Sequence, residues 1–249
     1  MLVIVAVKYS ILTMAPTIVL ITGTTRGIGK GLLELYLKRP NHIIIVGNRD
    51  PSDPKSTILH DLPKAEGTTL DIVKIDSTSP TDAATAADAL AAKFGHIDIL
   101  IANSGIANLF PKFVEVTIED IKPHIEVNYF GFIRLYQAFR LLLKKAKDPR
   151  WVTIGSSAAF LTNFGSHPNA AYGPTKAVQH WYTKAISFED PWLNAFPVDP
   201  GWVQTDLGGP QAPLTVAFST AKLLNVIDTS TRETHSGKMW SYDGSEVPW

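Results

Sequence analysis

Short apolar runs alternate along this chain with longer stretches in which apolar residues recur at a helical period. Several of the runs are continuously apolar rather than alternating, as expected of strands that are covered on both faces. The pattern predicts strands over residues 17–22, 42–47, 69–75, 97–102, 151–155, 194–198 and 238–241.

The stretches between these runs predict helices over residues 29–38, 80–93, 118–146 and 172–187. Strands and helices in this order indicate an α/β fold, with a doubly wound parallel β-sheet flanked by helices on both faces. A chain of 249 residues with 45% hydrophobic content can bury one sizeable core. Because no repeat or linker divides it, we expect a single domain over residues 15–249.

The first fourteen residues are apolar but fit neither a signal peptide nor a membrane span. They lack a basic start and a small-residue cleavage pattern, and Lys8 interrupts them well short of the ~20 apolar residues that a span needs. Met14 directly precedes the first strand and could be a second start site. We therefore expect residues 1–14 to be an extension outside the fold, with no membrane attachment.

Composition and charge exclude several kinds of partner and site. Lys plus Arg and Asp plus Glu number 23 each, so net charge gives no indication of a nucleic-acid partner. The absence of cysteine rules out disulfides and thiolate metal sites, and it fits a cytoplasmic enzyme. The spacings of His124, His167 and His180 form no ligand set, so no metal is expected.

A glycine-rich turn follows the first predicted strand, where Gly23, Gly27 and Gly29 lie in the sequence ITGTTRGIGKG. Glycines at the carboxyl end of such a strand let the backbone approach a pyrophosphate, and the next helix offers its unpaired N–H groups to the anion. The turn therefore predicts a dinucleotide site. The spacing G-x-x-x-G-x-G is a modest indication by itself, and a glycine-rich turn without a ligand is the alternative.

The end of the second strand bears on which dinucleotide binds. Asn48 stands where enzymes that prefer NAD carry an acidic residue, Arg49 follows it, and Arg26 in the glycine turn can reach the same place. Two guanidinium groups suit the 2′-phosphate of NADP(H), which we predict as the cofactor. In the alternative, Arg49 pairs with Asp50 or solvent and Arg26 lies on the surface, and Asp50 as the ribose contact would favour NAD.

Candidate catalytic groups follow the fifth predicted strand. Ser156 and its rival Ser157 end that strand, and Tyr172 and Lys176 lie four residues apart, which places them on one face of a helix. Pro174 is compatible with the first turn of that helix. An ammonium group near a phenol favours the phenolate, so proton exchange with a ketone or alcohol oxygen becomes feasible.

Taken together, these motifs resemble the short-chain dehydrogenases/reductases, a single-domain Rossmann-fold family, from about residue 17 to the end of the chain. The motifs that carry the resemblance are T-G-x-x-x-G-x-G at 22–29, Asp76, Asn103-Ser104-Gly105, Asn128, Ser156, Tyr172, Lys176 and P-G-x-x-x-T at 200–205. The sequences GWVQTDLG and SGKMWSYDG are similar to those of fungal ketoreductases related to norsolorinic acid reductase and, more distantly, of sniffer-type carbonyl reductases.

The resemblance implies a catalytic role for four residues. Tyr172 would donate the proton, Ser156 would position the carbonyl, and Lys176 would bind the nicotinamide ribose and lower the pKa of Tyr172. Asn128 would anchor a water relay through a kink in its helix.

The resemblance also implies the contacts of the cofactor. Asp76 would meet the adenine amine, residues 103–105 would pass beside the adenosine ribose, and Val203 and Thr205 would hold the carboxamide and the pyrophosphate side of the nicotinamide. The expected cofactor-binding residues are Gly23, Thr25, Arg26, Gly27, Ile28, Gly29, Asn48, Arg49, Asp76, Ser77, Asn103, Ser104, Gly105, Tyr172, Lys176, Pro200, Gly201, Val203 and Thr205.

Two features concern the substrate. Residues 206–222, where the family carries a mobile lid, look short. We expect Phe160, Phe164 and Trp202 near the nicotinamide, where aromatic walls suit a flat or apolar carbonyl compound, although Phe160 could be ordinary core.

These observations predict an NADPH-dependent ketoreductase that acts on an aromatic or apolar carbonyl compound, a class that includes polyketide-type secondary metabolites. A catalytically weak dinucleotide-binding sensor or regulatory protein is the alternative that the short lid favours, and an oxidative dehydrogenase is a third, because the chemistry is reversible. Family members commonly assemble through the helices within 118–146 and 178–186, so these faces could bury a partner subunit in a homo-dimer or homo-tetramer. The apolar residues Tyr129, Phe132, Leu135 and Phe139 are equally explained as sheet-facing core, which leaves the oligomeric state open.

Overall fold

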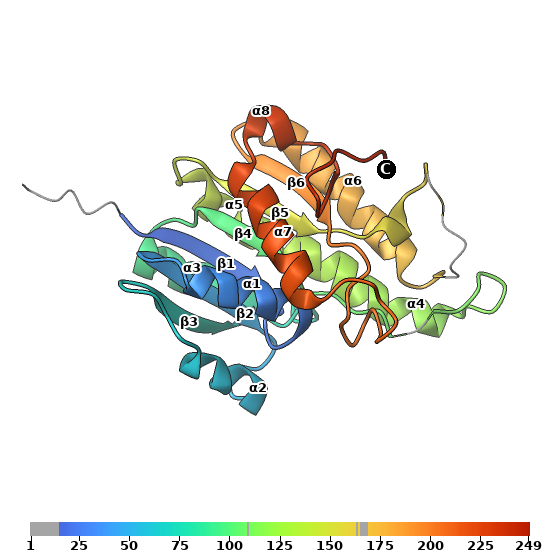
Figure 1. Ribbon diagram of the computed structural model, residues 1–249, viewed down its shortest axis with the longest axis horizontal. Coiled ribbons are helices and arrows are strands. Elements are labelled where there is room, and N and C mark those ends of the chain that lie inside the picture. Colours follow the sequence, from blue (N-terminus) through green and yellow to red (C-terminus); the bar gives the residue numbers. More distant parts are fainter. Residues whose placement is uncertain (1–14, 109, 163, 165–168) are drawn as a thin grey trace, which may run out of the picture.

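A parallel sheet of seven strands, in the order β3-β2-β1-β4-β5-β6-β7, forms the centre of the molecule (Figure 1). The computed structural model describes residues 15–108, 110–162, 164 and 169–249, and the expected extension 1–14 lies outside them. The strands are β1 Thr17–Thr22, β2 His42–Asn48, β3 Thr69–Lys74, β4 Ile99–Ala102, β5 Arg150–Ile154, β6 Asn194–Asp199 and β7 Trp240–Ser241. All seven predicted strands are present, and the predicted α/β Rossmann fold is confirmed.

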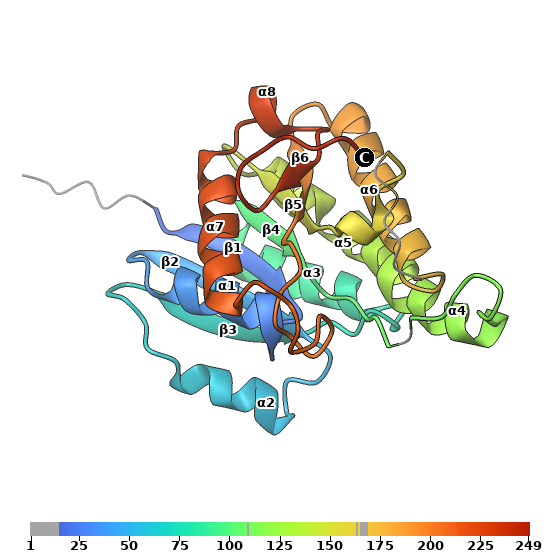
Figure 2. The ribbon, with the colours of Figure 1, turned by 45° about the vertical axis from the view of Figure 1, so that its right-hand side comes forward.

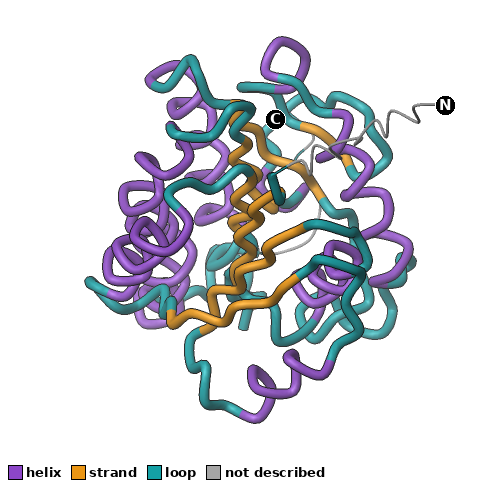
Figure 3. The backbone as a smooth tube through the Cα atoms, turned by 90° about the vertical axis from the view of Figure 1, so that its left-hand side faces the viewer, coloured by secondary structure: helices purple, strands orange, loops and turns teal. Residues whose placement is uncertain are grey.

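Helices cover both faces of the sheet (Figure 3). The described helices are α1 Gly27–Leu37, α2 Pro54–Thr57, α3 Asp82–Phe94, α4 Ile118–His124, α5 Gly131–Lys144, α6 Gly173–Glu189, α7 Val216–Thr229 and α8 Arg232–His235, with 3-10 turns η1 Ile58–Asp61 and η3 Ser157–Ala159 and a π-helical turn η2 Ile125–Phe130. Helices α1 and α7 pack side by side on one face (Figure 2), and α3, α5 and α6 cover the other.

Strand β1 shows why the apolar runs are continuous. Ile18 and Leu20 belong to the core under α3, α5 and α6, whereas Val19 and Ile21 belong to the core under α1 and α7. All four are at most 2% exposed. Successive strand residues point to opposite faces, so a strand between two helical layers needs apolar residues at every position.

The long helix predicted over residues 118–146 is divided into α4, the π turn η2 and α5. Pro123 near the end of α4 has no N–H to donate, so the regular hydrogen-bond ladder is interrupted just before η2 begins. The resulting irregular turn carries Asn128, which is fully buried.

Helix α7 was not predicted, and it shortens the part of residues 206–222 that could form a lid. Thr215 caps α7 by accepting the N–H of Phe218, so residues from Val216 onward are helical. They pack against α1, where a Cβ at Gly31 would lie 2.8 Å from the side chains of Val216 and Thr220. In the described part of the chain, no helix has the length and apolar composition of a membrane span.

Candidate active site

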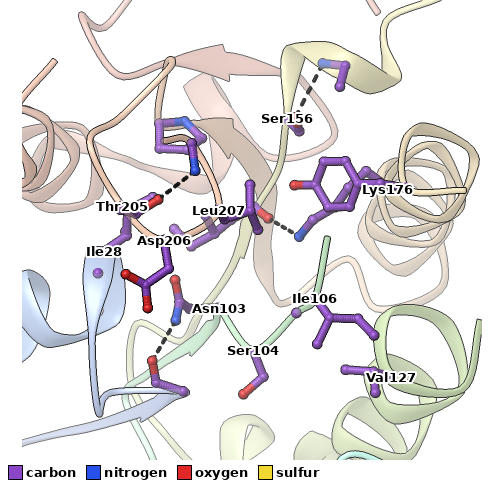
Figure 4. A pocket seen from close by; sticks show the side chains of 18 of the residues that line it. Ile28, Asn103, Ser104, Ile106, Val127, Ser156, Lys176, Thr205, Asp206 and Leu207 are labelled. Carbon is purple, nitrogen blue, oxygen red and sulfur yellow. Dashed lines mark hydrogen bonds between the residues drawn. The ribbon is translucent and has the colours of Figure 1, made fainter. Parts of the chain in front are cut away.

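One pocket opens where the carboxyl ends of the central strands meet, between β1 and β4, the point at which the strand order reverses. Every residue expected to bind the cofactor lines this pocket, and so does Ser156. Figure 4 shows Ser156 and Lys176 on one side, with Ile28, Thr205 and Asp206 on the other. Asn128 does not line the pocket, because it is buried behind it.

The glycine turn has the shape that a phosphate cradle requires. Gly23 and Gly27 have φ angles of +70° and +56°, which residues with a Cβ rarely adopt. At Gly29 a Cβ would lie 2.2 Å from the Gly23 carbonyl oxygen. Arg26 precedes α1, and among the described residues its side chain makes no capping hydrogen bond, so the first N–H groups of the helix face the pocket uncapped.

Asn48 holds this turn from the end of β2. Its Oδ1 accepts the backbone N–H of Thr24 at 3.1 Å and the Thr24 hydroxyl at 3.0 Å, and both side chains are buried. Asn48 therefore fixes the shape of the turn in addition to lining the pocket. The sequence pattern had not singled out Thr24.

Asn103 holds the turn from the end of β4. Its Nδ2 donates to the carbonyl oxygens of Thr22 at 2.8 Å and Gly23 at 3.1 Å. The Thr22 hydroxyl accepts the backbone N–H groups of Asn103 and Ser104 at 3.1 and 3.0 Å. The segment Asn103-Ser104-Gly105 thus holds the glycine turn in place and also lines the pocket.

Charged residues line the pocket in the glycine turn, after β2 and after β6. Arg26 forms an ion pair with Asp206 at 2.6 Å, and their side chains are 69% and 72% exposed. Arg49 is exposed and lines the pocket. The Asp50 carboxylate accepts the side-chain and backbone donors of Ser52, and these bonds lower the pKa of Asp50. Asp50 is therefore engaged by its own loop.

Ser156, Tyr172 and Lys176 meet at the end of the pocket opposite the glycine turn. Tyr172 stands at the start of α6, and the Lys176 ammonium lies 5.9 Å from the centre of its ring. The pKa of Tyr172 is raised to about 12, mainly by burial. The Ser156 hydroxyl lowers this pKa, and the Asp199 carboxylate raises it further. The lowering expected from Lys176 is not found, and Tyr172 holds its proton at neutral pH.

The two candidate serines, Ser156 and Ser157, can be distinguished by the groups that they contact. The Ser156 hydroxyl influences Tyr172, whose pKa it lowers, whereas the Ser157 backbone N–H donates to Asp199 Oδ1 at 3.0 Å and its hydroxyl lowers the pKa of Asp199. This arrangement favours Ser156 as the group that faces a reacting oxygen.

Lys176 is 4% exposed, and burial lowers its pKa to about 8. Its Nζ donates to the Ile154 carbonyl at 2.8 Å and to Gln179 Oε1 at 2.9 Å. These acceptors compensate for the water that the ammonium has lost.

Asn128 connects the π turn to the loop after β4. Its Oδ1 accepts the N–H of Ile106 at 2.8 Å, and its Nδ2 donates to the Ile106 carbonyl at 2.9 Å and to Thr175 Oγ1 at 3.0 Å. The main-chain carbonyl of Asn128 accepts a bond from Gln179. The water relay stays a prediction, and Gln179 is an unforeseen partner at this position.

His180 also contacts the candidate catalytic residues, and the sequence did not indicate this contact. Its Nε2 accepts the backbone N–H of Ser156 at 3.2 Å, and burial, assisted by the Lys176 charge, lowers its pKa to about 3. Gln179 and His180 follow Lys176 by three and four residues on α6, a spacing that places them near it and could have drawn attention to both.

Of the aromatic residues expected at the nicotinamide side, Phe164 and Trp202 line the pocket. Phe160 does not line it, because its ring is buried and lies 6.1 Å from the His180 ring. His167 lies outside the described residues.

Residues 203–214 form a compact loop over the pocket rather than a long lid. Gln204 and Leu214 join its two ends through a backbone bond of 2.8 Å, and Gly208 is held by Trp202 and Thr205. The segment that could cover a substrate is thus limited to the residues before α7.

Known proteins share this architecture and sequence. A family model described as short chain dehydrogenase matches residues 17–213. Norsolorinic acid ketoreductase of Aspergillus parasiticus is 37% identical over 248 residues, which cover 94% of this chain and 91% of that protein. The norsolorinic acid ketoreductase of Emericella nidulans is 34% identical over 247 residues, covering 94% of each.

Solved carbonyl reductases have the same fold. The NADPH-bound carbonyl reductase from chicken fatty liver gives a TM-score of 0.84 at 25% identity, covering 95% of this chain and all (100%) of that one. Carbonyl reductase Sniffer of D. melanogaster gives a TM-score of 0.85 at 25% identity, covering 94% of this chain and 100% of that one. The chain belongs to the short-chain dehydrogenase/reductase family of oxidoreductases.

Proposed function

We propose that this protein is an NADPH-dependent ketoreductase that reduces the carbonyl group of an aromatic or otherwise apolar compound. The observation that carries the proposal is the meeting of Ser156, Tyr172 and Lys176 at one end of a pocket whose other end is the uncapped glycine turn. A hydride donor bound along this pocket would extend from the phosphate cradle to the proton-donating tyrosine.

The residues around the glycine turn fit a dinucleotide. Addition of a Cβ at Gly29 would close the cradle, and the uncapped start of α1 offers donors to a pyrophosphate. Arg49 and Arg26 would hold the 2′-phosphate, whereas Asp50 is engaged by Ser52 and is poorly available to a ribose. The NADPH bound to the similar chicken carbonyl reductase supports the same preference.

The catalytic residues would act on the carbonyl oxygen. The reduced nicotinamide would supply the hydride. Ser156 would donate a hydrogen bond that positions the carbonyl, and Tyr172 would transfer its phenolic proton to the oxygen as negative charge develops there. Lys176 would bind the nicotinamide ribose and stabilise the phenolate that Tyr172 becomes.

Apolar side chains at the mouth of the pocket support an aromatic or apolar substrate. Those that line the pocket and are exposed by 40% or more are Phe110, Phe113, Leu161, Phe164, Trp202 and Leu207. An exposed cluster of this kind is typical of a surface that binds an apolar partner or ligand. A polyketide-type metabolite would match the ketoreductases to which the chain is similar.

The substitution Tyr172→Phe tests the proposal. Loss of a positioned general acid lowers rates by roughly 10²–10⁴-fold, so turnover of aromatic ketones should fall by that factor. NADPH affinity, measured by fluorescence titration, should stay within about threefold because the glycine turn is untouched. Tyr182→Phe is the matched control, since Tyr182 lies on the same helix and its hydroxyl pairs with Tyr129 instead.

Two results would count against an enzyme. If wild-type protein binds NADPH but reduces no carbonyl compound across a broad panel, the sensor function that the short loop favours replaces the ketoreductase. If Tyr172→Phe retains wild-type turnover, the proton donor is another group.

A homo-dimer or homo-tetramer is part of this proposal. Helices α5 and α6, which would form the interface, expose Leu141, Trp181 and Phe188 by 63% or more. Light scattering on the purified protein measures the oligomeric state directly.

A further inference from the structure

The side chain of Gln179 lies between two parts of the catalytic centre. Its Nε2 donates to the Asn128 carbonyl oxygen at 2.5 Å, and its Oε1 accepts from Lys176 Nζ at 2.9 Å. Because a carbonyl can only accept and an ammonium can only donate, the two bonds fix which end of the amide faces which partner. Gln179 is 2% exposed, so water does not compete freely for either bond.

The bond between Gln179 and Lys176 helps to orient a buried ammonium group. An ammonium has three N–H donors, and those to Ile154 and Gln179 occupy two of them. Tetrahedral geometry then fixes the direction of the third donor. Loss of the Gln179 contact would leave the ammonium with fewer acceptors in a site where burial already favours the neutral amine.

The bond between Gln179 and Asn128 concerns the π turn. A π turn interrupts the regular ladder, and here the Asn128 carbonyl bonds to a side chain from α6. The same turn holds the loop after β4 through the Asn128 side chain. Gln179 thus joins α6, which carries Tyr172 and Lys176, to the turn that shapes the floor of the pocket.

We propose that Gln179 is a positioning residue of the active site, whose amide orients the Lys176 ammonium and couples it to the π turn that carries Asn128. The inference rests on the proposed function, because it assigns Gln179 a role through Lys176 in dinucleotide binding and carbonyl reduction. Other ionisable groups that influence this centre are Tyr172 and His180 on α6 and Asp199 on β6, and all three are retained in the variants below.

Three variants test the role of Gln179. Gln179→Leu removes both hydrogen-bonding groups, Gln179→Met does so while keeping the length of the side chain, and Gln179→Glu places a carboxylate beside Lys176. The first readout is the pH dependence of NADPH affinity, by fluorescence titration and without turnover. The second is the pH profile of kcat/KM for reduction of an aromatic ketone.

In wild-type protein both quantities should decline as the pH rises through about 8, where Lys176 loses its charge. Gln179→Leu and Gln179→Met should move this decline to lower pH by about one pH unit, because an acceptor of the charged form is lost. Gln179→Glu should move it to higher pH, because a nearby anion favours the ammonium. A general loss of packing would lower the melting temperature of every variant. It would not move the pH of the decline down in Gln179→Leu and Gln179→Met and up in Gln179→Glu.

The proposal is overturned if the decline stays at the wild-type pH in all folded variants, or if it moves in the same direction in all of them. If Gln179→Leu does not fold, the comparison of Gln179→Met with Gln179→Glu decides the matter. Failure of the proposed function looks different, because wild-type protein would then reduce no ketone, whereas the pH dependence of NADPH affinity would still report on Gln179.

Discussion

The ion pair between Arg26 and Asp206 leads to a prediction about cofactor selectivity. Arg26 is expected to hold the 2′-phosphate of NADPH, yet its guanidinium here contacts the Asp206 carboxylate at 2.6 Å. The carboxylate and the phosphate would therefore compete for the same cation. We expect Asp206→Asn to tighten the binding of NADPH and to leave the binding of NADH unchanged.

The expected change in NADPH affinity can be estimated from the solvent exposure of Arg26 and Asp206. Both side chains are about 70% exposed, 69% and 72%, so this is a surface ion pair of small net stability. Such pairs contribute at most ~1 kcal/mol, which corresponds to about a fivefold change in an equilibrium constant. The dissociation constant for NADPH should accordingly fall by roughly two- to fivefold, and the effect should shrink at high salt because exposed charges are screened.

Fluorescence titration with NADPH and with NADH measures both constants, with Arg49→Ala as a companion variant that should weaken NADPH selectively. Asp228→Asn is the matched control, because Asp228 pairs with Arg39 outside the residues that line the pocket. Equal changes for the two cofactors, or weaker NADPH binding by Asp206→Asn, would show that Arg26 does not exchange the carboxylate for a phosphate.

Two further substitutions test the two ends of the pocket. Gly29→Ala should lower NADPH affinity more than tenfold and lower the stability by about 1–3 kcal/mol, measured by thermal unfolding, since its methyl group would lie 2.2 Å from a backbone oxygen that cannot move away. His180→Leu should lower kcat by roughly tenfold, because it leaves the Ser156 N–H without its acceptor, whereas His180→Gln should retain most activity because its amide reaches the same distance. The buried His235 provides a control, and a loss of kcat in His235→Leu equal to that in His180→Leu would contradict a specific role for His180.

The sequence predicted the strands well because each one lies between two helical layers and must be apolar throughout. It predicted the helices less well. Helix α7 was missed because its sequence, VAFSTAKLLNVIDT, carries small and hydroxylated residues where it packs closely on α1 near Gly31. The resemblance implied a kink at Asn128, but the π turn itself was not predicted, because Pro123 shows that a ladder is interrupted and not how the chain continues after it.

The site residues were found where the chemistry depends on a local spacing, as in the glycine turn and in the pair of Tyr172 and Lys176. Contacts between distant segments were not visible in that way. The bond that Thr24 donates to Asn48 and the ion pair of Arg26 with Asp206 join residues 24 and 180 positions apart. No pattern within one element indicates such partners, because they are chosen by the way the strands and loops come together.

Burial has opposite consequences for the proposed roles of Tyr172 and Lys176, and their hydrogen-bond partners differ accordingly. Burial favours the neutral form of both, raising the pKa of Tyr172 to about 12 and lowering that of Lys176 to about 8. A neutral tyrosine is the form that can give a proton to a carbonyl oxygen, and burial keeps Tyr172 in that form, although the raised pKa makes it a weaker acid. A neutral lysine would be the wrong form for stabilising a phenolate, and this group has two oxygen acceptors, from Ile154 and Gln179. The acceptors are placed where burial works against the proposed reaction.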